Sequence, residues 1–202
     1  VPPEPPHAGP GGQGGARAAR RAAHHAGRIV RIARRPEMGV RAVRVREDRP
    51  VVALPDVVTM VAREFESMVS RRQQTLAIHA EPASVLGDLD DIGILARNLL
   101  DNAVRYSGEG ARIEIACGMD PDGASAWLAV RDNGPGVPAE ERERIFERFF
   151  RGSHGNGERG SGIGLSLVQR IARAHEAMIT VSDGIAGRGF GCRVGFSAAQ
   201  DA

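Results

Sequence analysis

The sequence lacks lysine altogether, so all 27 of its basic residues are arginine. A Walker-type phosphate loop needs the run Gly-Lys-Ser/Thr, and a P-loop ATPase is therefore excluded. Cysteine is nearly absent too: Cys117 and Cys192 are too few for a disulfide framework or a sulfur-ligated metal site. The longest apolar runs, such as 127–130, fall far short of the roughly 20 residues that span a bilayer. We therefore expect a soluble chain whose two thiols are buried and reduced.

Charge is distributed unevenly along the chain. Residues 1–50 hold 11 arginines and 4 acidic residues, whereas the remainder holds 16 arginines and 21 acidic residues. A chain of 202 residues with 42% hydrophobic content can form one principal domain and a small appendage. Pro, Gly and Ala dominate the beginning, so we expect a disordered tail over 1–17, a basic arm over 18–49 and a domain over 50–202.

The basic arm has the spacing of a helix. Ala22, Ala26, Ile29 and Ala33 recur every three or four residues between arginines, and Pro36 would end the helix. The pattern favours a dimerisation or docking helix, and a solvated basic segment is the alternative. An arm that binds nucleic acid would interleave aromatic residues, which are missing here, so no nucleic-acid partner is expected.

The domain alternates helical and strand-like segments. Helical spacing predicts helices from Pro55 past Met68, from Asp88 or Asp90 to about Tyr106, over 139–149 and over 163–174. Alternating patterns predict strands over 75–80, 113–117, 126–130, 178–182 and 189–196, with a hairpin at 121–123. Helices come in pairs and strands largely in hairpins. We therefore predict an α+β fold, a two-layer α/β sandwich whose mixed, mostly antiparallel sheet carries its helices on one face.

The helix ending near Tyr106 carries a polar face. Asn98 and Asn102 are four residues apart, with Arg105 one turn further along, so the three side chains can meet one ligand. Amide oxygens can ligate Mg²⁺, and a guanidinium can neutralise a phosphate. Taken alone, this pattern is more typical of a solvated helix face, and the neighbouring motifs favour the ligand site.

Asp132 directly follows a predicted strand and precedes Gly134-Pro135-Gly136, a turn whose backbone can approach a flat ring closely. A carboxylate there can accept a proton from an exocyclic amine. It would select adenine over guanine, whose carbonyl would face the carboxylate as a second, unmatched acceptor.

Glycines at 152, 155, 157, 160, 162 and 164 make a loop that ends at a predicted helix start. Such a loop offers free backbone amides and a favourable helix dipole to phosphates, with Gly160, Gly162 and Gly164 permitting close approach. A long surface linker is the alternative interpretation.

Four motifs in this order resemble the catalytic ATP-binding domain of bacterial sensor histidine kinases, over about residues 50–198. They are Asn98-x-x-x-Asn102-x-x-Arg105-Tyr106, Asp132-x-Gly134-x-Gly136, Ile145-Phe146-Glu147-Arg148-Phe149 and Gly160-x-Gly162-x-Gly164-Leu165. The resemblance implies the Bergerat fold of the superfamily that includes DNA gyrase, mismatch-repair and heat-shock chaperone ATPases. It assigns the asparagines to the N box, Asp132 to the adenine amine, Phe146 and Phe149 to the F box, and the glycines to the ATP lid, with ATP and Mg²⁺ as ligands.

The chain departs from the family pattern in several places. Arg105 stands where lysine is frequent, His175-Glu176-Ala177 where His-Gly-Gly is common, and Phe190 where a threonine or serine is frequent. We expect His175 to be structural. None of the six histidines has the sequence context of the family's phosphoacceptor, and the arm over 18–35 resembles a remnant of the second dimerisation helix.

The resemblance thus predicts a histidine kinase ATP-binding domain without a certain catalytic residue of its own and without self-phosphorylation. Its expected partners are the dimerisation and phosphoacceptor domain of a parent chain and, through it, a response regulator receiver. The expected location is cytoplasmic, with anchoring of the parent in the inner membrane left open. The alternative is an anti-sigma-type serine kinase or regulatory nucleotide-binding module, in which the F box is usually missing. An ATP-driven machine is disfavoured because Asn98 stands where a glutamate base would be needed.

Overall fold

The computed structural model describes residues 30–31, 49–152 and 161–199. The elements are β1 (Val30–Arg31), β2 (Val51–Ala53), α2 (Leu54–Arg71), β3 (Thr75–Ala80), β4 (Ser84–Leu86), α3 (Leu89–Tyr106), β5 (Arg112–Met119), β6 (Ser125–Asp132), η2 (Arg144–Phe146), α4 (Gly164–Ala174), β7 (Met178–Asp183), η3 (Ile185–Gly187) and β8 (Phe190–Ser197). Within these described residues, no helix has both the length and the apolar character needed to cross a membrane.

The main sheet has six strands in the order β1-β7-β8-β6-β5-β3. β3 and β5 are parallel, and all the other neighbours are antiparallel. β5 and β6 form the predicted hairpin. The predicted mixed, mostly antiparallel sheet is therefore confirmed. A second, two-stranded antiparallel sheet of β2 and β4 was not predicted.

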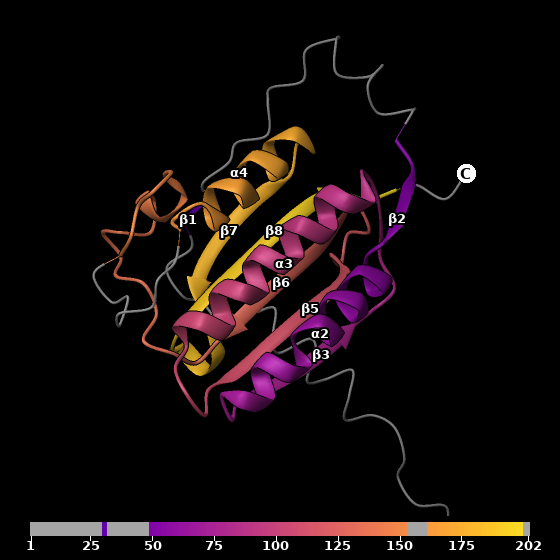
Figure 1. Ribbon diagram of the computed structural model, residues 1–202. Helices are drawn as coiled ribbons and strands as arrows, with labels where there is room; N and C mark the ends of the chain where they lie inside the picture. Colours follow the sequence, from indigo (N-terminus) through magenta and orange to yellow (C-terminus); the bar gives the residue numbers. More distant parts are fainter. Residues whose placement is uncertain (1–29, 32–48, 153–160, 200–202) are drawn as a thin grey trace, which may run out of the picture.

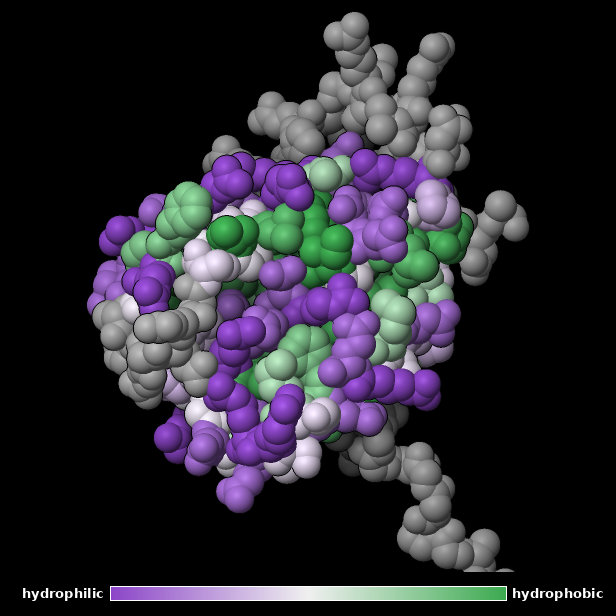
Figure 2. Space-filling model, viewed as in Figure 1, coloured by the Kyte–Doolittle hydropathy of each residue, from purple (hydrophilic) through white to green (hydrophobic). Residues whose placement is uncertain are grey.

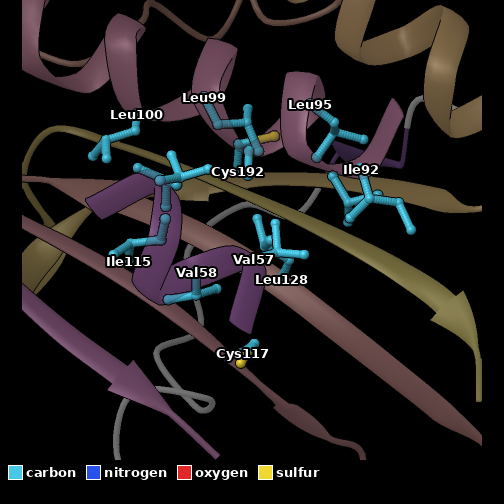
Figure 3. Close-up of a cluster of buried hydrophobic side chains, with 14 of the residues drawn as sticks. Val57, Val58, Ile92, Leu95, Leu99, Leu100, Ile115, Cys117, Leu128 and Cys192 are labelled. Carbon is cyan, nitrogen blue, oxygen red and sulfur yellow. The ribbon is translucent and has the colours of Figure 1, made fainter. Parts of the chain in front are cut away.

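Three helices cover one face of the main sheet, as predicted (Figure 1). α3 lies in the middle and contacts both α2 and α4. Hydrophilic residues occupy much of the outer surface on this side (Figure 2), so the apolar stripe of each helix faces inward. Side chains of α2 and α3, such as Val58 and Leu95, meet Ile115 and Leu128 of the sheet in one core (Figure 3). This core contains Cys117 and Cys192, both buried and unpaired, as expected.

Helices α2 and α3 begin where the sequence predicts. Pro55 lies in the first turn of α2, where its missing N–H costs nothing. The Asp88 side chain caps α3 by accepting from the amide of Asp91 at 3.0 Å. The amide of Asp88 in turn donates to Nε2 of His175 at 3.1 Å, and Nδ1 of the same ring lies 2.9 Å from the carbonyl oxygen of Ile171. His175 therefore ties the start of α3 to the end of α4, and its predicted structural role is confirmed.

Two expectations need correction. The predicted helix over 139–149 is wrong, because a short 3₁₀ helix at Arg144–Phe146 is flanked by turns. Of the helix predicted over 18–35, Val30 and Arg31 are described, and they pair as a strand with β7 instead. Residues 1–29 and 32–48, which contain the rest of that helix and the predicted tail, lie outside the described residues.

Candidate functional site

A cavity of about 820 Å³ lies beside the C-terminal half of α3, the start of α4 and the connection from β6 to α4. That connection is the orange segment extending beside the sandwich in Figure 1. The cavity is lined by Asn98, Asp101, Asn102, Arg105, Tyr106, Asp132, Pro135, Gly136, Val137, Pro138, Glu141, Ile145, Phe150, Arg151, Gly152, Ser161, Gly162, Ile163, Gly164, Leu165 and Phe190. Segments about 90 residues apart in the chain thus meet in one concave site.

α3 presents one polar face to this cavity. Asn98 donates its amide NH₂ to the carbonyl oxygen of Ile94 at 2.7 Å, which leaves its side-chain oxygen for another partner. The side chain of Asn102 makes no hydrogen bond within the described part of the chain. Arg105 Nε lies 2.7 Å from a carboxylate oxygen of Asp101, one turn earlier on the same helix. Two amides and one ion pair therefore line the same wall.

Asp132 lies at the end of β6 and is only 5% exposed. Its Oδ1 accepts two backbone hydrogen bonds, from Gly134 at 2.8 Å and from Phe190 at 3.2 Å. Burial raises the pKa of this carboxyl to about 6, and the two amides offset only part of that effect. The carboxylate therefore remains mostly ionised at neutral pH despite its burial.

The second oxygen of Asp132 has a different environment. Oδ2 accepts no hydrogen bond from the described residues, and the residue lines the cavity. Oδ2 alone is therefore available to accept a hydrogen bond from a ligand. Guanine presents two adjacent donors that suit both oxygens of a carboxylate, whereas the amine of adenine needs a single acceptor. The geometry favours an amine.

Glycines let backbone segments approach closely around this carboxylate. A Cβ at Gly134 would lie 2.5 Å from the Cα of Ser107, the residue that caps α3. At Gly136, which has a φ of +76°, a Cβ would lie 2.7 Å from the carbonyl oxygen of Gly189. Gly134 therefore lets the end of β6 pack directly on the end of α3.

Glycines also fit the start of α4 against its neighbours. A Cβ at Gly164 would lie 3.0 Å from the side-chain oxygen of Asn98, and one at Gly162 would lie 2.8 Å from the Cα of Phe149. No side chain caps this end of α4. The first-turn amides of an uncapped helix have no intrahelical acceptor, so they can serve an anion in the cavity.

The profile of the Histidine kinase-, DNA gyrase B-, and HSP90-like ATPase family matches residues 87–200. This range contains the α3 asparagines, Asp132 and the glycines of the cavity. The chain belongs to this family.

Sensor kinases are among the relatives of this histidine-kinase-type ATPase domain. It is 33% identical over 133 residues to the signal transduction histidine-protein kinase/phosphatase MprB of Mycolicibacterium vanbaalenii, covering 65% of this chain and 27% of that protein. It is 40% identical over 128 residues to the sensor protein BasS of Salmonella typhimurium, covering 62% of this chain and 35% of that protein. The chain thus spans about a quarter to a third of these curated relatives.

Solved structures show the same fold. The structure of a mycobacterial sensor histidine kinase MprB has a TM-score of 0.65 and 30% identity, covering 75% of this chain and all of that one. The predicted Bergerat fold, and with it the predicted membership of the ATPase family, are confirmed.

The structure brings most of the predicted site residues together. Nine of them line the cavity: Asn98, Asn102, Arg105, Tyr106, Asp132, Gly136, Gly162, Gly164 and Leu165. Gly134 supports the carboxylate without lining the cavity, and Gly160 lies outside the described residues.

The two phenylalanines of the predicted F box do not line the cavity. Phe146 is buried in the core, whereas Phe149 is 68% exposed and has a φ of +66°. Phe150 lines the cavity instead, with the guanidinium of Arg144 over its ring at 4.5 Å. Three phenylalanines within five residues gave no periodic signal for which one faces the site.

Arg142 was missed by sequence reasoning. It is 8% exposed, donates through Nε to the carbonyl oxygen of Val137 at 3.2 Å, and forms an ion pair of 2.5 Å with Asp183 at the end of β7. It thereby fastens the cavity wall to the sheet. A buried arginine with its partner 41 residues away cannot be recognised from spacing.

Proposed function

We propose that this domain binds Mg-ATP and presents the γ-phosphoryl group to a histidine outside the described site, in two-component signal transduction. One observation carries the proposal. A single cavity joins the buried carboxylate at the end of β6 to a wall of amides on α3 and to an uncapped helix start on α4.

The adenine end is built around Asp132. Its Oδ1 is held by two backbone amides, and its Oδ2, which accepts no hydrogen bond from the described residues, would accept the exocyclic amine. Pro135, Val137 and Pro138 provide apolar walls for a flat ring. This arrangement uses the carboxylate for recognition, not for proton transfer.

The phosphate end is built by α3 and α4. The side-chain oxygens of Asn98 and Asn102 are the candidate Mg²⁺ ligands, since one amide commits only its NH₂ group and the other makes no hydrogen bond to the described residues. A bound Mg²⁺ would neutralise phosphate charge and leave the rest of its coordination to phosphates and water. Arg105 and the first-turn amides of α4 supply the remaining positive potential.

The reaction requires only positioning and charge neutralisation. An imidazole nitrogen of the acceptor histidine donates its lone pair to the γ-phosphorus, while the bond to the bridging oxygen breaks and ADP leaves with that electron pair. Neither of the described histidines, His79 and His175, lines the cavity. The acceptor would come from a dimerisation domain of the parent chain, which would pass the phosphoryl group to a response regulator. We propose a cytoplasmic location, where ATP is available and the two buried thiols would stay reduced.

A phosphotransfer experiment tests this function. The chain is incubated with radiolabelled Mg-ATP, alone and with a separately produced dimerisation domain of its parent. We expect no label on the chain alone and acid-labile label on the added domain. Labelling of the chain alone that disappears in a His24→Gln/His25→Gln variant would show that the acceptor lies in the basic arm. Absence of transfer although ATP binds would refute the kinase function.

A further inference from the structure

Phe190 is the immediate neighbour of the amine-reading carboxylate. The β6–β8 ladder ends with the pair Arg131–Gly191, and Asp132 and Phe190 are the next residues of the two strands. The amide of Phe190 donates to Oδ1 of Asp132 at 3.2 Å, and both residues line the cavity. Phe190 therefore lies next to the carboxylate and contributes to the same cavity.

The residues of the glycine turn and Phe190 bring no side-chain hydrogen-bond donor to this neighbourhood. Both nearby amides, of Gly134 and Phe190, are directed at Oδ1 of Asp132. The cavity residues that follow the glycine turn, Pro135, Val137 and Pro138, have no polar side-chain atoms. A hydroxyl or amide side chain at position 190 would add a donor here, and phenylalanine cannot.

The edge of adenine presents two groups side by side, the donor amine and the acceptor ring nitrogen N1. A site that reads both needs an acceptor next to a donor. Asp132 supplies the acceptor, and Phe190 occupies the neighbouring position with an apolar ring. We infer that Phe190 is a specificity-determining residue: it leaves the ring nitrogen N1 without a side-chain donor, so that recognition rests on the purine amine. The inference rests on the proposed binding of ATP.

The inference predicts an unusual ligand preference. An acceptor placed next to an apolar ring loses hydration without gaining a partner, which costs binding free energy. The triphosphate of 1-deazaadenosine, which has CH in place of N1, should therefore bind at least as tightly as ATP. The triphosphate of purine riboside, which lacks the amine, should bind about tenfold more weakly or worse.

The test is calorimetric titration of the full chain with the three triphosphates in the presence of Mg²⁺, repeated with Phe190→Thr and Phe190→Leu. The ratio of the 1-deaza Kd to the ATP Kd should be one or less in the unsubstituted chain and in Phe190→Leu, whose side chain remains apolar. In Phe190→Thr the hydroxyl can donate to N1, so the ratio should rise about fivefold or more. Circular dichroism spectra and melting curves identify any variant that is not folded.

Each outcome has one interpretation. If the unsubstituted chain binds the 1-deaza analogue more than about fivefold more weakly than ATP, the site forms a hydrogen bond to N1 and the inference is wrong. An unchanged ratio in folded Phe190→Thr would likewise overturn the role of this residue. If ATP does not bind, or binds equally well to Asp132→Asn, the proposed function fails and not only the inference.

Discussion

Replacing Asp132 by asparagine should stabilise the empty domain while weakening its binding of ATP. Asparagine keeps an oxygen that can accept from the amides of Gly134 and Phe190, and it removes the buried charge. Burial raises the pKa of Asp132 from 3.8 to about 6 in the folded chain. A raised pKa means that the folded state prefers the protonated acid. The contribution of this group to stability is therefore fully present below about pH 4 and is lost as the pH rises to about 6.

The size of the effect follows from the pKa. At about 1.4 kcal/mol for each pH unit, a rise from 3.8 to about 6 costs the parent about 3 kcal/mol at pH 7–8. The side chain is 5% exposed, so solvent screens little of this cost. Asp132→Asn should be more stable than the parent at pH 8 by up to about 3 kcal/mol, and the difference should shrink toward zero between pH 6 and 4. Its affinity for ATP should fall by about 1–3 kcal/mol, because an NH₂ group would then face the adenine amine.

Urea unfolding at pH 4.5, 5.5, 7 and 8 measures the stability difference, and calorimetry measures binding. Asp122→Asn is the matched control, because this exposed turn carboxylate accepts one backbone hydrogen bond, from Ala124, that asparagine can also accept. The control should gain no comparable stability at pH 8, because its charge is exposed to solvent. A stability difference for Asp132→Asn that is zero or negative at pH 8, or that does not change with pH, would refute the buried-charge argument.

Three further predictions concern the same cavity. Asn102→Ala should lose the Mg²⁺-dependent part of its affinity for ATP and keep its affinity for adenosine, which has no phosphates. If the affinities for ATP and adenosine fell equally, the residue would support the fold and not the metal. Adenosine affinity of the parent should fall as pH drops through about 6, because Oδ1 of Asp132 accepts two amides and the proton must occupy Oδ2; a flat pH profile would contradict this. Gly134→Ala should destabilise the domain by about 1–3 kcal/mol, because its Cβ would meet the α3 cap backbone at 2.5 Å. The control Gly93→Ala should stabilise α3 by about 0.5–1 kcal/mol, because a Cβ there would have its nearest neighbour 3.8 Å away. Equal urea midpoints for the two glycine variants would contradict this prediction.

Much of the fold could be predicted from the sequence because long elements carry a periodic signal. The strand at Thr75–Ala80 has the predicted bounds, and Asp88 is one of the two predicted caps, since alternation and capping chemistry are local properties. β2 and β4 have three residues each and pair across about 30 residues of chain, so they carry no period to detect. The predicted helix over 139–149 is wrong because the backbone there closes successive three-residue turns, such as Glu141 to Pro138 and Arg144 to Glu141, although its buried residues Arg142 and Phe146 have helical spacing.

The candidate site could be predicted only as far as its motifs are local. Asn98, Asn102 and Asp132 were found because a helical face and a glycine turn can be read directly, and the structure places all three at one cavity. In the sequence Phe190 is visible only as a departure from the family pattern, because its contact with Asp132 joins residues 58 positions apart. Arg142 had no local signal at all.

Titration of the full chain with Mg-ATP and Mg-GTP tests the central claim most directly, because the cavity is proposed to read one amine with one carboxylate oxygen. We predict that Mg-ATP binds at least about tenfold more tightly than Mg-GTP, and that Asp132→Asn removes most of this preference. Equal affinities for the two nucleotides, or no binding of Mg-ATP by the folded chain, would contradict the account.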